Sequence, residues 1–149
     1  MALAVLWLHV VSAVVWVGGL AYQSHVLLPL ARRGEVAPFA EAARRARAVT
    51  WTAISLVVLT GFYNITQLGP MERVMQSGAG LILAGKFILV LIVVAVAAQR
   101  DFTHLVRLHL SLATNADPTP ALSAIARLDR LTIVLGAILI YLGLAISRS

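Results

Sequence analysis

Residues Gly80–Ala98 read GLILAGKFILVLIVVAVAA, an apolar run of nineteen residues with one charged side chain, Lys86. A helix needs about 20 mostly apolar residues to cross the hydrocarbon core of a bilayer, so this run predicts a membrane-spanning helix. Three other stretches have the same character, two of them shorter: Ala2–Leu28, Thr50–Thr66 and Leu131–Ile146. The sequence therefore predicts an all-α protein that forms a four-helix transmembrane bundle with antiparallel neighbours.

The composition supports this prediction. Of the 149 residues, 60% are hydrophobic and 12% are charged, whereas a soluble domain carries about 25% charged residues. We expect residues 1–149 to form a single transmembrane domain covered by membrane lipids. The first apolar stretch lacks a basic segment before it and is too long for a signal peptide, which favours a retained helix. The protein has no cysteine, which excludes disulfides and thiolate chemistry.

The second and fourth spans are short, but helix-forming sequence precedes both. Pro38 is followed by FAEAARR and Pro120 by ALSAIAR. Proline is favoured at the first position of a helix, so these stretches predict helices that begin outside the membrane and run into it.

Arginine placement predicts the orientation. Nine arginines lie in the two long connections, and two lie elsewhere outside the spans. Cytoplasmic loops of membrane proteins are enriched in basic residues, so both termini are expected on the non-cytoplasmic side, with helices extended on the cytoplasmic side. The same reasoning assigns the net charge of +6 to topology, and no nucleic acid partner is expected. The nine are Arg32, Arg33, Arg44, Arg45, Arg47, Arg100, Arg107, Arg127 and Arg130, and the two are Arg73 and Arg148.

Two polar residues interrupt the apolar spans at matching depth. His9 and Lys86 each lie about seven residues into a span from the non-cytoplasmic side, which is roughly 10 Å at about 1.5 Å per residue. A charge inside a span costs about 2.5–3.5 kcal/mol on insertion scales and demands an explanation. Either the pair belongs to a site, or Lys86 extends its ammonium group outward to the interface and His9 only bonds another helix.

Further candidates share the His9 side of the bundle. At about 100° per residue, Ser12, Trp16, Gly19 and Gln23 project on the same side of the first helix as His9, and such a polar stripe normally faces the bundle interior. Asn64 and Tyr141 fall at a similar height in the second and fourth spans. The predicted cofactor-binding residues are thus His9, Lys86, Trp16, Gly19, Asn64 and Tyr141, with His9 as the metal ligand.

These motifs resemble two families. The string from His9 through Trp16 and Gly18-Gly19-Leu20, with the later segment from Gly85-Lys86, resembles the copper-resistance D (CopD) domain. His9 and Lys86 also resemble a histidine and a lysine of the HemJ family of four-helix membrane proteins, which is linked to protoporphyrinogen oxidation. The resemblance implies that these two residues contact haem.

Three functional alternatives are open, of which the resemblance implies the first two and the small four-helix architecture suggests the third. The first is a multi-pass protein of the bacterial-type inner (plasma) membrane that binds haem b or porphyrin in the outer half of the bundle for a redox role. Whether it would be a haem-dependent oxidoreductase stays open. The second is copper transport or resistance, and the third is a non-catalytic subunit or assembly partner, as a homo-oligomer or within a larger membrane complex.

Overall fold

The computed structural model describes residues 2–67 and 78–146, and within these ranges the protein is helical, with short turns and no strand. Four long helical stretches follow one another. The first comprises α1 (Ala2–Tyr22), a π-helical segment η1 (Gln23–Leu27) and α2 (Leu28–Arg32), and the second is α3 (Val36–Thr66). The third comprises α5 (Gly78–Gln99), a π-helical segment η2 (Arg100–His104) and α6 (Leu105–Ala113), and the fourth is α7 (Thr119–Ile146). The predicted all-α fold with four long helices is confirmed.

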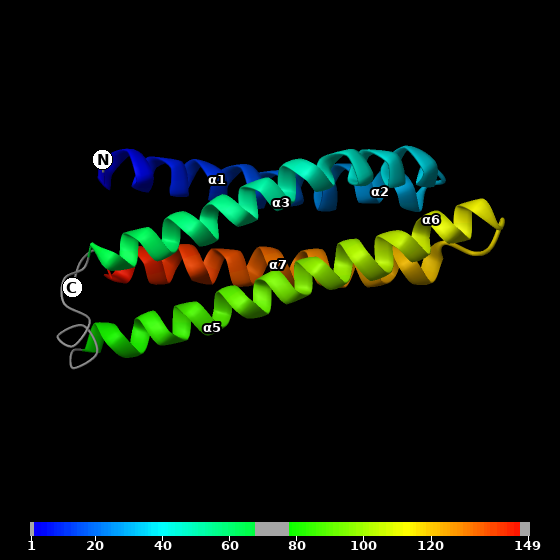
Figure 1. The fold of residues 1–149 in the computed structure, drawn as a ribbon. Coiled ribbons are helices and arrows are strands. Elements are labelled where there is room, and N and C mark those ends of the chain that lie inside the picture. The colour runs from blue at the N-terminus through cyan, green and yellow to red at the C-terminus, as the bar shows by residue number, and fades with distance from the viewer. Residues whose placement is uncertain (1, 68–77, 147–149) are drawn as a thin grey trace.

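Consecutive stretches run antiparallel along an elongated bundle (Figure 1). α1 packs chiefly against α3, and α5 packs chiefly against α7, while a smaller contact between α1 and α7 joins the two pairs. The beginning of α1 and the end of α7 lie at the same end of the bundle (Figure 1). The opposite end, named the connection end, is formed by α2, α6 and the first turns of α3 and α7.

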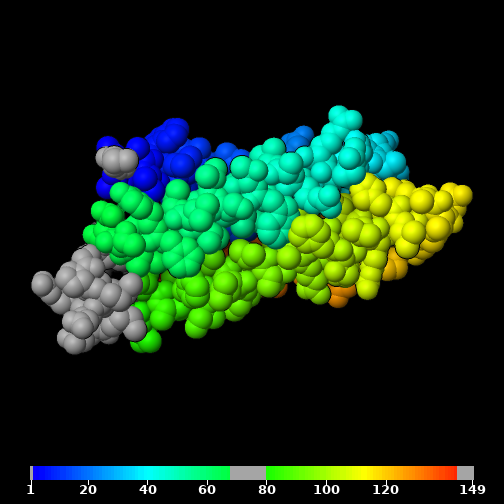
Figure 2. All heavy atoms as spheres, viewed as in Figure 1, coloured from blue at the N-terminus to red at the C-terminus, as the bar shows by residue number. Residues whose placement is uncertain are grey.

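The bundle surface is strongly apolar. In the part of the sequence that the structure describes, three helical stretches are long and apolar enough to cross a membrane: Ala2–Arg32, Val36–Thr66 and Gly80–Ala113. Large apolar side chains project outward along them, and Leu3 and Leu81 are 80% and 82% exposed. Figure 2 shows one side of the bundle, on which α3, α5 and α6 cover most of the face and α1 is visible along one edge. Exposed apolar area of this extent is typical of a surface that contacts membrane lipid or another protein.

Two apolar clusters hold the stretches together. The larger lies at the connection end and the smaller lies nearer the middle of the bundle. Alanines in both let the helix backbones approach closely. The larger cluster is built around Phe39, Leu105, Leu108, Leu122 and Ile125; the smaller consists of Trp16, Ala53, Ile54, Val93 and Ala97.

The two turns of the connection end have defined helix stops. After α2, the N–H of Glu35 donates to the C=O of Leu30 and the N–H of Gly34 donates to the C=O of Ala31, both at 3.1 Å, which is a Schellman motif. Gly34 has a φ of +116°, a conformation that other residues rarely adopt. After α6, Asn115 takes the left-handed position with a φ of 51°, as asparagine can.

The second and fourth helices extend backward from their apolar parts, as predicted. α3 begins at Val36 and α7 at Thr119, so Pro38 and Pro120 are the third and second helical residues and not the first. Proline fits there because first-turn N–H groups have no intrahelical acceptor. Asp117 accepts a hydrogen bond from the Thr119 N–H at 2.9 Å, and the hydrogen bonds from Thr119 lower the pKa of this carboxyl.

Candidate functional site

His9 is half-buried on α1 and contacts α3 through Thr60. Its Nδ1 atom lies 2.8 Å from the Oγ1 atom of Thr60. The Thr60 hydroxyl donates its single proton to the backbone carbonyl oxygen of Leu56, one turn earlier, so it can only accept from His9. With the hydroxyl proton donated to Leu56, a neutral imidazole that bonds Thr60 carries its proton on Nδ1 and its lone pair on Nε2. Ligating histidines are commonly fixed in this way by a hydrogen bond to the other ring nitrogen.

Lys86 is half-buried on α5 and lies close enough to His9 for its charge to act on the imidazole. Two glycines make room for this pair. A β-carbon at Gly143 of α7 would lie 3.3 Å from Nζ of Lys86, and one at Gly61 of α3 would lie 3.4 Å from Cε1 of His9. All four stretches thus contribute to the surroundings of His9 and Lys86.

The other predicted site residues are placed differently. Trp16 is buried in the smaller apolar cluster, and Asn64 is half-buried on α3. Tyr141 is 71% exposed. Gly19 is exposed as well, and a β-carbon there would meet nothing within 4 Å. The stripe on the first helical stretch is therefore buried at Ser12, Trp16 and Gln23 and half-buried at His9, whereas Gly19 faces outward.

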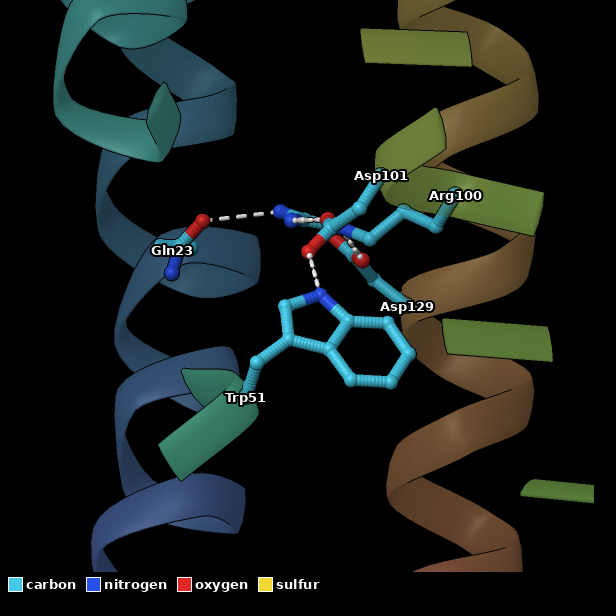
Figure 3. A network of polar contacts seen from close by, with 5 residues as sticks. All are labelled: Gln23, Trp51, Arg100, Asp101 and Asp129. Carbon is cyan, nitrogen blue, oxygen red and sulfur yellow. Dashed lines mark hydrogen bonds and ion pairs between the residues drawn. The ribbon is translucent and has the colours of Figure 1, made fainter. Parts of the chain in front are cut away.

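A second polar group lies in the bundle interior, where most of its side chains are buried (Figure 3). Arg100 is 6% exposed and donates three hydrogen bonds from one guanidinium. Nη2 donates to Oε1 of Gln23 at 2.8 Å, Nη1 to Oδ1 of Asp101 at 2.7 Å, and Nε to Oδ1 of Asp129 at 2.6 Å. The indole N–H of Trp51 donates to Oδ2 of Asp101 at 3.0 Å. We call these five residues the arginine network.

The two π-helical segments carry the central residues of this network. Gln23 is the first residue of η1, and Arg100 and Asp101 are the first two of η2. A π-turn accommodates one extra residue and changes the direction of the side chains that follow, and it occurs often at functional sites. From α3, Trp51 packs beside Phe102, with 5.4 Å between the ring centroids, and so holds its N–H toward Asp101.

The arginine network is not apparent from the sequence. Arg100 counts by sequence among the arginines that set topology, but it is buried and neutralises carboxylates instead. Without Arg100, the long connections contain eight arginines that bear on orientation, against two elsewhere. Those two, Arg73 and Arg148, lie outside the described residues. The signal in the sequence is an Arg-Asp pair directly after the most apolar run, together with Asp129 in an otherwise apolar and basic helix.

Two cavities lie away from His9 and Lys86. A groove of about 410 Å³ runs between α1 and α3 and is lined mostly by apolar side chains, with Ser12 and Thr52 among them. A smaller cavity of about 220 Å³ at the connection end is lined by Leu27, Leu30, Glu35, Pro38 and Phe39. Neither is lined by His9 or Lys86. Within residues 2–67 and 78–146, no group of three or more His, Cys, Asp or Glu side chains could hold a metal ion.

Comparison with known proteins adds no assignment: no protein-family model, no curated protein and no solved structure matches this sequence.

Proposed function

We propose that this is a multi-pass membrane protein with four spans and both termini on the non-cytoplasmic side of a bacterial-type inner membrane. Three stretches of suitable length and hydropathy support the membrane assignment. Eight arginines near the connection end, seven of them exposed and Arg47 half-buried, support a cytoplasmic position for that end. The fourth span would be the apolar part of α7, from Leu131 onward.

We further propose that this protein binds haem b or a related porphyrin, with His9 as the axial ligand. The observation that carries this proposal is the hydrogen bond between Nδ1 of His9 and Thr60. A hydrogen bond at Nδ1 orients the imidazole ring and favours the tautomer whose Nε2 atom can bind a metal, which is what an axial ligand requires. The resemblance of His9 and Lys86 to the HemJ pair points to the same cofactor.

Lys86 has two roles open to it beside such a cofactor. Its amine can act as a second ligand, or its ammonium can pair with a propionate. Gly61 and Gly143 keep the space next to both side chains free of β-carbons. A bound haem would supply one-electron redox chemistry, while His9 and Lys86 would bind and orient it. Because Gly19 and Tyr141 point outward, this proposal does not include them.

Copper is the weaker alternative on chemical grounds. Copper ions are held by several imidazole, thiolate or thioether donors together. The described residues contain no group of three or more His, Cys, Asp or Glu side chains placed for that purpose. A single imidazole is enough for haem. The residues around His9 therefore fit haem better than copper. If no cofactor binds, the remaining alternative is a role as a ligand-free assembly partner.

The deciding experiment is a visible absorption spectrum of the protein, expressed with a haem precursor and purified in detergent. A Soret band is expected in the wild type and should be lost or shifted in His9→Ala. Thr60→Val removes the acceptor for Nδ1 and should weaken haem affinity about 10- to 100-fold, the usual effect of losing such a partner, whereas Thr60→Ser should retain it. His25→Ala is the control, because His25 is exposed and bonds only the backbone of Ala21.

Absence of a Soret band from well-folded wild-type protein would refute haem binding. In that case, a stoichiometric partner that co-purifies with ligand-free protein would support the assembly role, and changed copper accumulation in whole cells would support copper transport.

A further inference from the structure

Asp129 has an unusual position in the arginine network, because one of its two carboxylate oxygens is unsatisfied. The residue is completely buried on α7. Its Oδ1 atom accepts from Nε of Arg100 at 2.6 Å, but Oδ2 is buried and has no hydrogen-bond partner among the described residues. Buried polar atoms are nearly always paired, so an unpaired one calls for an explanation.

Asp101 provides an internal comparison. It is 2% exposed, yet both of its oxygens are paired: Oδ1 accepts from Arg100 and Oδ2 from the indole of Trp51. Two donors of this kind stabilise the ionised form of a carboxylate. Of the two aspartates, Asp101 therefore has a donor for each of its oxygens, and Asp129 has a donor for one of them only.

The charges of the network lead to the same distinction. One guanidinium faces two carboxylates, so full ionisation would leave one excess negative charge in the interior. The guanidinium keeps its proton under all ordinary conditions, so it cannot adjust. An uncompensated buried charge is strongly unfavourable. A proton on Oδ2 of Asp129 removes this charge and makes the network neutral.

Other charged groups near Asp129 do not change this balance. The groups whose charges act on it are Arg100 and Asp101, both from η2. The charges that act on His104, also in η2, are those of Arg107 and Arg127. From the first stretch, the amide of Gln23 meets Arg100, while His25 and Arg32 are exposed. On α7 itself, Arg127 and Arg130 are exposed.

We propose that Asp129 is a reversible proton-binding site in the bundle interior. On uptake, an O–H bond forms at Oδ2 with a proton from hydronium, which is left as water, and release returns that proton to water. Arg100 and Asp101 remain an ion pair throughout. The network therefore alternates between neutral and singly negative at the point where η1, η2, α3 and α7 meet. This site is separate from His9, and the proposal for Asp129 does not depend on haem binding.

Infrared spectroscopy of the full-length protein in lipid nanodiscs tests this proposal directly. A protonated carboxylic acid has a C=O stretching band that a carboxylate lacks. We expect the wild type to show such a band at neutral pH and to lose it reversibly at alkaline pH. The band should be absent in Asp129→Asn and retained in Asp117→Asn, because Asp117 is exposed.

Thermal unfolding of the same variants assigns the proton to Asp129 and not to Asp101. Asparagine has the shape and neutrality of a protonated aspartic acid, so Asp129→Asn should unfold at a temperature close to that of the wild type. Asp101→Asn should unfold at a clearly lower temperature, because an amide cannot accept from Arg100 and Trp51 with both of its terminal atoms.

Three results would overturn the proposal. The first is a wild type without a protonated-carboxyl band at neutral pH. The second is a band that persists in Asp129→Asn. The third is the reverse order of stability, including an Asp129→Asn variant that fails to fold while Asp101→Asn folds normally.

Discussion

The Nε atom of Arg100 lies 2.6 Å from Oδ1 of Asp129, a residue 29 positions later in the sequence, and both side chains are buried. This hydrogen bond joins η2 to α7. Because the same guanidinium also reaches Gln23, one cation connects the first, third and fourth helical stretches (Figure 3). The contact between the α1–α3 pair and the α5–α7 pair therefore depends on a polar centre as well as on apolar packing.

Replacing Arg100 should destabilise the bundle strongly. Arg100→Leu leaves Asp101 and Asp129 buried without their cation, and breaking a buried pair in this way costs about 3–5 kcal/mol. Arg100→Lys should also be destabilising, because an ammonium is a compact charge that lacks the planar fork of three separated donors. The free energy of unfolding, measured by denaturant titration in detergent micelles, gives the size of both effects.

Arg107→Leu is the matched control for Arg100→Leu. Arg107 is an exposed arginine seven residues further along the same helical stretch, so its loss should change stability little. Equal effects of the two substitutions would mean that the arginine network contributes nothing beyond surface charge.

Two leucines of α6 that differ in burial should also differ in how much they contribute to stability. Leu108 is completely buried in the larger apolar cluster, whereas Leu110, two residues later, is 62% exposed. Leu108→Ala should cost about 2–5 kcal/mol, because it removes buried methyl groups and leaves a cavity. Leu110→Ala should cost much less. The same unfolding titration measures both, and a larger effect at Leu110 would contradict the assigned face of α6.

The helices are predictable from sequence because each depends on a long, local pattern. The run from Gly80 to Ala98 and its three counterparts are visible without knowledge of any contact. The positions of His9 and Lys86 along their helices are predictable from residue counts alone. Their lateral neighbours are not, and this is why Tyr141 is expected inside the bundle and lies outside it.

The arginine network could not be predicted, because it rests on contacts between residues 29 to 77 positions apart and on two π-helical segments. A helical projection assumes regular α-helix, and each π-turn breaks that assumption. Nothing in the sequence around Gln23 or Arg100 signals such a turn. By sequence, Arg100 therefore resembles one more basic residue at the end of a span.

The orientation of the protein gives a third prediction. A reporter fused after Arg45 or near Asn115 should report the cytoplasm, and one fused at Ser149 should report the opposite side. The reason is that the exposed arginines gather near the connection end, and basic residues are retained on the cytoplasmic side. Paired alkaline phosphatase and green fluorescent protein fusions make this measurement. A cytoplasmic signal from the fusion at Ser149 would show that the arginine distribution does not govern insertion here.

Substitution of Lys86 tests whether this residue belongs to a cofactor site or is only a charge within an apolar span. If Lys86 only extends its ammonium toward the membrane surface, Lys86→Leu removes an unfavourable group from an apolar span. Insertion should then improve by up to about 2.5–3.5 kcal/mol, with haem occupancy unchanged. If Lys86 belongs to the site proposed with His9, the same substitution should lower haem occupancy despite better insertion. Membrane insertion assays and the Soret absorbance per protein measure the two quantities separately.

Lys86→Arg then separates the two ways in which Lys86 could hold a cofactor. Arginine keeps the positive charge and can pair with a propionate, but its guanidinium stays protonated and is a poor metal ligand. Retained haem in Lys86→Arg would therefore indicate an ion pair, and loss of haem from a normally folded variant would indicate coordination by the amine. The larger arginine head must still fit beside Gly143, where a single β-carbon would already lie 3.3 Å from Nζ. Gly143→Ala is the steric control: if it leaves the haem spectrum unchanged, crowding at this position cannot account for a loss seen in Lys86→Arg.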